Sequence, residues 1–240
     1  MKDSYSNIFT FNKKNLGNTV NYLNTGNIVG LPTETVYGLG GNAYKKISVK
    51  KIFKLKRRPK SNPLIIHYYD LKGVVNDVEV NDYFLKLYKK FCPGPITFIL
   101  KKKINSRIHS LASANLDTVA IRFPRHRIIR SILKKINFPL AMPSANKSSS
   151  VSPIRAEDVF DEFQKKLKLI IDGGKSKIGI ESTVIDLTNF PTILRPGIID
   201  KNSIEKILRF KLKKVSRGAK INSPGMMKKH YSPGIPVLIN

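Results

Sequence analysis

The chain has 240 residues, of which 41% are apolar, so it is long and apolar enough for one large globular domain or one domain with an appendage. It contains no apolar run long enough to span a membrane and no apolar stretch near residue 1 typical of an export signal, so we expect a cytoplasmic protein without a membrane segment. The formal net charge of +28 favours anionic partners such as nucleotides or RNA, although lysine pairs spread along the whole chain make this charge unspecific.

The predicted helices and strands alternate irregularly along the chain. Apolar residues at helical spacing, as in Leu16, Val20 and Leu23, predict helices over residues 13–24, 48–55, 82–91, 127–135, 156–167 and 203–209. Short apolar runs between turn residues predict strands over residues 27–31, 64–68, 97–100, 118–123, 139–142, 169–172, 183–187 and 192–194. Several strands are separated by turns too short to hold a crossover helix. We therefore expect an α/β fold of the α+β type, with a twisted mixed sheet and helices packed around it.

Residues 211–240 differ in composition from the rest of the chain. Lysine and arginine dominate at first, Pro-Gly turns follow, and large apolar residues are few. Because such a segment cannot form a core of its own, we expect one folded domain over residues 1–210 and a basic tail over residues 211–240. The tail would be ordered only by lying on the main domain as a lid.

Residues 30–40, Gly-Leu-Pro-Thr-Glu-Thr-Val-Tyr-Gly-Leu-Gly, place hydroxyls, a carboxylate and glycines directly after an apolar run. Such a segment is typical of the floor of a site, because glycines allow close backbone approach. Residues 38–43 also fit the dinucleotide pattern G-x-G-x-x-A. However, lysines and arginines stand about twenty positions later, where that pattern needs an acidic residue, so we expect a turn at residues 38–43.

A pair of cations, Lys56 and Arg58, follows a predicted helix, and Asn62 lies in the next loop between Pro59 and Pro63. A triphosphate would neutralise such a cluster, with arginine gripping two oxygens and lysine acting as a point charge. A solvated basic helix end, whose cations satisfy the last carbonyls, accounts for the same residues equally well.

Thr118 and Arg122 flank an apolar run, and strand alternation places both on one face. An arginine on so apolar a strand needs an anionic partner, and we favour a substrate carboxylate over a protein aspartate. His67 ends another apolar strand, where a hydrogen-bonded structural histidine is more common than a base or a ligand. Histidines without ligand spacing and a single cysteine, Cys92, predict no metal site built by the protein.

Small polar residues follow the predicted strand at 139–142. Ser144 and Asn146 come directly after it, and Ser152 closes the serine-rich stretch beyond them. Hydroxyl and amide groups in a loop can bind phosphate or ribose through their own atoms and through exposed backbone N–H groups. A flexible serine-rich turn is the alternative.

The polar motifs of this chain stand in the order of a known family. They are residues 33–40, Lys56-Arg57-Arg58-Pro59, Pro63-Leu64-Ile65-Ile66-His67, Pro143-Ser144-Ala145-Asn146 and Glu181-Ser182-Thr183-Val184. Over about residues 15–210 the chain resembles the YrdC-like family, whose members make threonylcarbamoyl-AMP for tRNA modification. The resemblance implies a concave active-site cavity and a nucleotidyltransferase that joins L-threonine, bicarbonate and ATP into threonylcarbamoyl-AMP and pyrophosphate. It also implies that Mg²⁺ is carried by ATP, with no metal ligand from the protein.

The resemblance also assigns roles to single residues. L-threonine would be held by Thr35, His67, Arg122, Met142 (through its backbone) and Ser182. ATP would be surrounded by Lys56, Arg58, Asn62, Thr118, Ser144, Asn146, Ser152, Arg195 and Tyr231. Lys56 and Arg58 would be the catalytic residues, because threonine carbamate must attack the α-phosphorus while negative charge builds on the phosphates.

Residues 223–233 resemble the linker of the family's long form, which leads into a second, Rossmann-like domain, and we expect that domain to be absent here. A downstream threonylcarbamoyl-transferase complex would carry the product to tRNA, with at most a weak direct tRNA contact. The main alternative is a non-catalytic module that binds double-stranded RNA or tRNA. Another is a carbamoyl-transfer domain of the hydrogenase-maturation type, whose acylphosphatase and zinc modules the sequence lacks.

Overall fold

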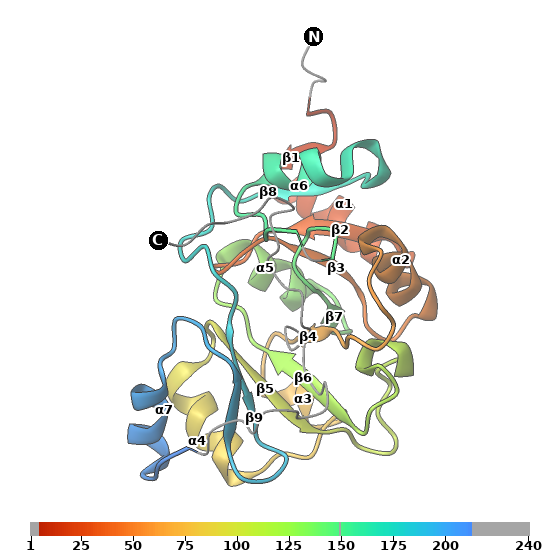
Figure 1. Cartoon of the computed structure of the whole chain (residues 1–240). Coiled ribbons are helices and arrows are strands. Elements are labelled where there is room, and N and C mark those ends of the chain that lie inside the picture. Colours follow the sequence, from red (N-terminus) through yellow and green to blue (C-terminus); the bar gives the residue numbers. More distant parts are fainter. Residues whose placement is uncertain (1–4, 149, 213–240) are drawn as a thin grey trace.

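The computed structural model describes residues 5–148 and 150–212, which form one mixed sheet with helices on both faces (Figure 1). The strand order is β1-β8-β2-β3-β7-β4-β6-β5-β9-β10. The strands are β1 (Ile8–Thr10), β2 (Ile28–Leu31), β3 (Gly38–Asn42), β4 (Ile65–His67), β5 (Ile96–Lys101), β6 (Thr118–Arg122), β7 (Leu140–Ala141), β8 (Ile170–Asp172), β9 (Thr183–Asp186) and β10 (Thr192–Arg195). Parallel pairs such as β4–β6 and antiparallel pairs such as β5–β6 occur together, so the predicted mixed sheet is confirmed.

The helices of the described residues agree closely with the sequence periodicity. They are α1 (Lys13–Asn24), α2 (Lys46–Lys56), α3 (Leu71–Val74), α4 (Asp82–Phe91), α5 (Arg127–Lys135), α6 (Ala156–Phe163) and α7 (Lys201–Leu208), with 3₁₀ turns η1 (Ser110–Ser113) and η2 (Gln164–Lys166). On α5 the buried stripe consists of Ile128, Ile129, Ile132 and Leu133, as its spacing predicts. The predicted helix at 156–167 ends earlier, because Gln164 turns to a φ of 47° and a 3₁₀ turn follows.

Two apolar layers cover the two faces of the sheet, because successive side chains of a strand point to opposite sides. On β2, Ile28 belongs to the larger layer, whereas Val29 and Leu31 belong to the layer built with α1 and α5. A smaller cluster on β4, β6, β5 and β9 consists of Ile65, Ala120, Ile99 and Val184. The candidate site described below adjoins this smaller cluster.

Residues 38–43 were expected to form a turn, and this prediction is wrong for most of them, since residues 38–42 form β3 in the middle of the sheet. The glycines serve packing. A Cβ at Gly38 would lie 2.6 Å from Met142 Cγ, and one at Gly40 would lie 2.8 Å from Leu31 Cδ1. The strand therefore needs glycine because neighbouring side chains lie directly over its backbone.

Within residues 5–148 and 150–212, no helix is long and apolar enough to cross a membrane. Only residues 211 and 212 of the predicted tail are described, and there Leu212 is buried in the larger apolar layer near α7. The division into a domain over residues 1–210 and a tail over residues 211–240 stays a prediction.

Candidate active site

A cavity with about 540 Å³ of empty space, partly open to solvent, lies where several strands end. Its lining consists of Thr33, Thr35, Val36, Tyr37, Gly38, Arg58, Ile65, His67, Arg122, Met142, Pro143, Ser144, Glu181, Ser182 and Arg195. The structure thus gathers, from six distant segments, all the residues predicted to hold threonine. It adds Arg58, Ser144 and Arg195 from the predicted nucleotide set.

The floor of the cavity is the segment between β2 and β3, which the Thr33 side chain holds in place. Thr33 Oγ1 donates a hydrogen bond to the Val36 carbonyl at 2.6 Å and accepts from the backbone N–H groups of Thr35 and Val36, both at 3.2 Å. Thr35 Oγ1 lies 2.9 Å from Thr33 Oγ1. Since the Thr33 proton is used by Val36, Thr35 donates in this contact, and its oxygen keeps lone pairs for a donor in the cavity.

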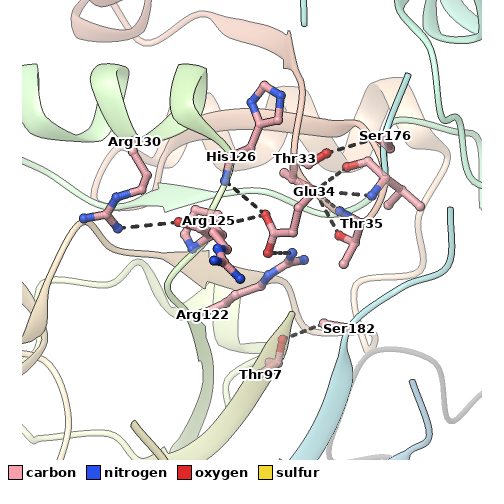
Figure 2. Close-up of polar contacts among 12 residues, drawn as sticks. Thr33, Glu34, Thr35, Thr97, Arg122, Arg125, His126, Arg130, Ser176 and Ser182 are labelled. Carbon is pink, nitrogen blue, oxygen red and sulfur yellow. Dashed lines mark hydrogen bonds and ion pairs between the residues drawn. The ribbon is translucent and has the colours of Figure 1, made fainter. Parts of the chain in front are cut away.

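Glu34 and Arg122 form a buried ion pair beside the floor (Figure 2). Glu34 Oε1 accepts from Arg122 Nη2 at 2.7 Å, and Oε2 accepts from the backbone N–H groups of Arg125 at 3.0 Å and His126 at 3.3 Å. Burial alone raises the pKa of Glu34, but the Arg122 charge and these hydrogen bonds together hold the pKa below its usual value. Glu34 is therefore an ionised partner that fixes the guanidinium.

The anionic partner of Arg122 in this structure is thus a protein carboxylate, whereas the sequence analysis favoured a substrate carboxylate. The pairing is incomplete, however. Arg122 Nε is buried and has no hydrogen-bond partner among the described residues. A buried N–H without an acceptor is costly, so the guanidinium retains capacity for a further acceptor in the cavity.

His67 lies next to Arg122 in the sheet and is 2% exposed. Its Nδ1 lies 3.3 Å from the Ile65 carbonyl. Burial and the neighbouring Arg122 charge lower the pKa of His67 to about 3, so the imidazole is neutral near pH 7. A neutral ring that is fixed by its neighbours can donate or accept a hydrogen bond to a ligand without changing the charge of the site.

A second polar network borders the cavity at the start of β9. Arg195 forms an ion pair with Glu181, and Ser152 Oγ donates to Glu181 Oε1 at 2.8 Å. Arg195 Nη2 donates to Ser182 Oγ at 3.1 Å, and Ser182 Oγ lies 2.8 Å from Thr97 Oγ1. Glu181 and Ser182 thereby join residues predicted for the nucleotide with one predicted for threonine.

The structure separates the predicted catalytic pair. Lys56 was expected to face phosphates, but it is 1% exposed and does not line the cavity. Its Nζ donates to the Ser144 carbonyl at 2.6 Å, to the Asn146 carbonyl, and to Asn146 Oδ1 at 3.3 Å. Burial and the nearby Arg58 charge lower the pKa of Lys56 to about 7, whereas its acceptors favour the charged form. Lys56 thus holds the loop that carries Ser144 and Asn146.

Arg58 lines the cavity itself. Its Nε donates to the Asn62 carbonyl at 2.9 Å, and its Nη2 donates to Asn62 Oδ1 at 2.5 Å and to the Pro63 carbonyl at 2.7 Å. Burial lowers the pKa of Arg58 to about 10, so the guanidinium remains charged near neutral pH. Asn62 is buried and does not line the cavity, so it acts on the site by aiming Arg58.

The remaining predicted nucleotide residues lie in different places. Asn146 and Ser152 line a neighbouring recess with about 960 Å³ of empty space, next to Val151 and Ile154. Thr118 begins β6, opposite Lys101 of β5, and lines neither space. Tyr231 lies outside the described residues. The roles assigned to these residues stay predictions.

Among the described residues, no group of three or more His, Cys, Asp or Glu side chains could hold a metal ion. The carboxylates nearest the cavity, Glu34 and Glu181, are each paired with an arginine. The donor set therefore fits a divalent ion that arrives with its own phosphate ligands better than one held by the protein.

The comparisons with known proteins decide the family. The family described as "Telomere recombination", which comprises Sua5, YciO and YrdC proteins, matches residues 21–197. The chain belongs to the Sua5/YciO/YrdC family. Residues 199–240 match a second description, "Threonylcarbamoyl-AMP synthase, C-terminal domain".

Members of the Sua5/YciO/YrdC family with curated names share much of this sequence. The threonylcarbamoyl-AMP synthase of Pyrococcus abyssi is 40% identical over 224 residues, which are 91% of this chain and 65% of that protein. The threonylcarbamoyl-AMP synthase of Bacillus subtilis is 39% identical over 217 residues, which are 88% of this chain and 62% of that protein. The chain thus spans slightly less than two thirds of the length of these relatives.

Solved structures of the Sua5/YciO/YrdC family share the fold. The crystal structure of P. abyssi Sua5 complexed with L-threonine aligns with a TM-score of 0.88 and 37% identity, over 94% of this chain and 68% of that one. E. coli YciO aligns with a TM-score of 0.74 at 24% identity, over 83% of this chain and 99% of that one, which shows the fold alone.

The sequence analysis missed several residues that the structure places at this family's site. Glu34 and Glu181 were noticed within their motifs, but no role was assigned to either. Thr97 was treated as an ordinary strand residue. Its hydroxyl within an otherwise apolar strand, Ile96-Thr97-Phe98-Ile99, is the signal that could have identified it.

Proposed function

We propose that this chain is an L-threonylcarbamoyladenylate synthase, which converts L-threonine, bicarbonate and ATP into threonylcarbamoyl-AMP and pyrophosphate. The observation that carries the proposal is the gathering of all the predicted threonine residues with Arg58, Ser144 and Arg195 in one cavity. The names of the relatives and the threonine complex of P. abyssi Sua5 support it.

The chemistry of the cavity fits threonine group by group. The guanidinium of Arg122, with its Nε lacking an acceptor, suits a carboxylate, and the lone pairs of Thr35 suit an amine or hydroxyl donor. Val36, Ile65 and Met142 add apolar surface for the substrate methyl group. These side chains supply a reason to prefer threonine over serine.

The nucleotide half fits a charge-stabilising mechanism. In this mechanism the carbamate oxygen of threonine forms a bond to the α-phosphorus of ATP, and the bond to pyrophosphate breaks. Arg58 and Arg195 line the cavity and would stabilise charge on the phosphates, while Ser144 and Asn146 lie on the loop held by Lys56. Mg²⁺ bound to ATP would neutralise further phosphate charge. Because positioning and charge stabilisation suffice for this displacement, no dedicated base is required.

Purified protein should release pyrophosphate from ATP and Mg²⁺ only when L-threonine and bicarbonate are both present, as measured by a coupled pyrophosphate assay with each component omitted in turn. Replacing threonine with serine should lower kcat/KM by about 10–200-fold, because the methyl contact is lost. Equal turnover with serine, or no turnover with threonine, would contradict the proposal.

A second candidate property, weak tRNA binding, is favoured by a basic groove between α2 and α6. Its cations are Lys51, Lys54, Arg57, Lys147, Lys166 and Lys168. Glu162 is the one carboxylate among the described residues that line the groove, and it lies 3.4 Å from the Lys147 ammonium. Such a groove suits a phosphate backbone without reading bases. The downstream transferase complex would then receive both product and tRNA.

The triple charge reversal Lys54→Glu, Arg57→Glu and Lys166→Glu should weaken tRNA binding and flatten its salt dependence, by a slope of roughly one per lost phosphate contact. Filter binding over a salt series measures both. The matched control is Lys72→Glu, Lys86→Glu and Lys206→Glu, three exposed lysines elsewhere on the surface. Equal loss in both triple variants would assign tRNA binding to overall charge, and salt-resistant binding would favour a dedicated RNA-binding module.

A further inference from the structure

Thr97 lies on β5 directly behind the cavity. Its side chain is fully buried and does not line the cavity, whereas that of Ser182 does. The two hydroxyl oxygens are 2.8 Å apart, and they lie close together in Figure 2 although the residues are 85 positions apart in the sequence. Ser182 Oγ is also 3.1 Å from Arg195 Nη2.

The directions of these hydrogen bonds follow from the partners available. A guanidinium has only donors, so Arg195 donates to Ser182. Within the described part of the chain, the Thr97 hydroxyl has one hydrogen-bond partner, Ser182. If Ser182 donated to Thr97, the Thr97 proton would be buried without an acceptor, which is costly. Thr97 therefore donates to Ser182, whose oxygen accepts twice and whose own proton is directed into the cavity.

We propose that Thr97 is a positioning residue that fixes Ser182 as a hydrogen-bond donor to an anionic oxygen of the substrate. The ligand chemistry is a carboxylate or carbamate oxygen of an amino acid, and this assignment rests on the proposed function. The cavity supports it in two ways. Its lining contributes the guanidinium groups of Arg58, Arg122 and Arg195, which favour anionic oxygens, and Thr35 already offers lone pairs for the substrate's donors. Ser182 and Thr35 would thus distinguish the two ends of the amino acid.

The opposite explanation is that Thr97 only fills space in the strand. Thr97→Val tests this, because valine keeps the β-branched shape and removes only the hydroxyl. L-threonine affinity, measured by calorimetry, should fall about 3–10-fold in Thr97→Val. Thr97→Ser, which restores a hydroxyl, should recover most of that affinity, and ATP affinity should change less.

The double-mutant cycle with Ser182→Ala is the decisive arm. If Thr97 acts through Ser182, Thr97→Val should cause no further loss of threonine affinity in the Ser182→Ala background. Thr19→Val is the matched control, because Thr19 is equally buried and donates to the Asn15 carbonyl at 2.7 Å on α1, away from the cavity. It should lower stability without changing threonine affinity.

Wild-type affinity in Thr97→Val, or equal losses in both backgrounds, would overturn the positioning role while leaving the proposed function standing. Failure of the wild-type protein to bind L-threonine would instead overturn the proposed function, and this role with it. Both variants should remain folded by circular dichroism, so the comparison does not depend on a large change in stability.

Discussion

Arg58→Ala should lower the rate of adenylate formation by about 10²–10³-fold, because a charged donor aimed at developing phosphate charge is lost. Arg58 lines the cavity, and its guanidinium is aimed by Asn62 and Pro63. Steady-state pyrophosphate release with saturating threonine and bicarbonate measures the effect. Arg57→Ala is a matched control, since Arg57 is exposed and lies outside the cavity. A wild-type rate in Arg58→Ala would make this residue a solvated cation at a helix end.

Lys56→Ala should also lose activity, but by a different route. Removal of the ammonium leaves the Ser144 and Asn146 carbonyls and Asn146 Oδ1 without their donor, which costs about 1–3 kcal/mol for each buried group left unsatisfied. Urea unfolding should therefore show a clear loss of stability in Lys56→Ala and a smaller one in Arg58→Ala. The same loss of stability in both variants would contradict the separate roles that the structure assigns to these cations.

Arg122→Ala should reduce the free energy of unfolding by about 3–5 kcal/mol and abolish threonine binding, because Glu34 would remain buried without its counter-charge. Urea unfolding and threonine calorimetry measure the two effects. Because the pKa of Glu34 is lowered in the folded protein, the ion pair stabilises the fold above pH about 4.5 and loses that effect as pH falls through the folded pKa. The stability difference between wild type and variant should therefore shrink in acid.

The double variant Glu34→Gln/Arg122→Ala separates stability from binding. It should recover much of the stability, because no buried charge is left unpaired, yet it should still not bind threonine. Recovery of threonine binding together with stability would show that Arg122 supports only the fold. A larger loss of ATP affinity than of threonine affinity would move Arg122 to the nucleotide half of the site.

The sequence predicts those features that depend on local patterns. The helical spacing on α5 and the short turns between strands follow from neighbouring residues, and both are confirmed. The gathering of Thr35, His67 and Ser182 in one cavity was expected only from the order of the motifs.

Features that depend on distant partners could not be predicted. The glycines at 38–42 suggest a turn until Met142 and Leu31 are seen packed over them. Glu34 and Arg122 are 88 positions apart, so nothing near either residue identifies its partner. Lys56 resembles a phosphate ligand in sequence because only the fold shows that the loop at 144–146 already occupies its ammonium.

Mass spectrometry of the reaction with ¹³C-bicarbonate tests the central claim most directly. The account predicts an adenylate that contains threonine and a ¹³C-labelled carbamoyl group, formed in equal amount with pyrophosphate and absent when threonine is omitted. Formation of ADP and phosphate instead, or an adenylate without the labelled carbon, would contradict it.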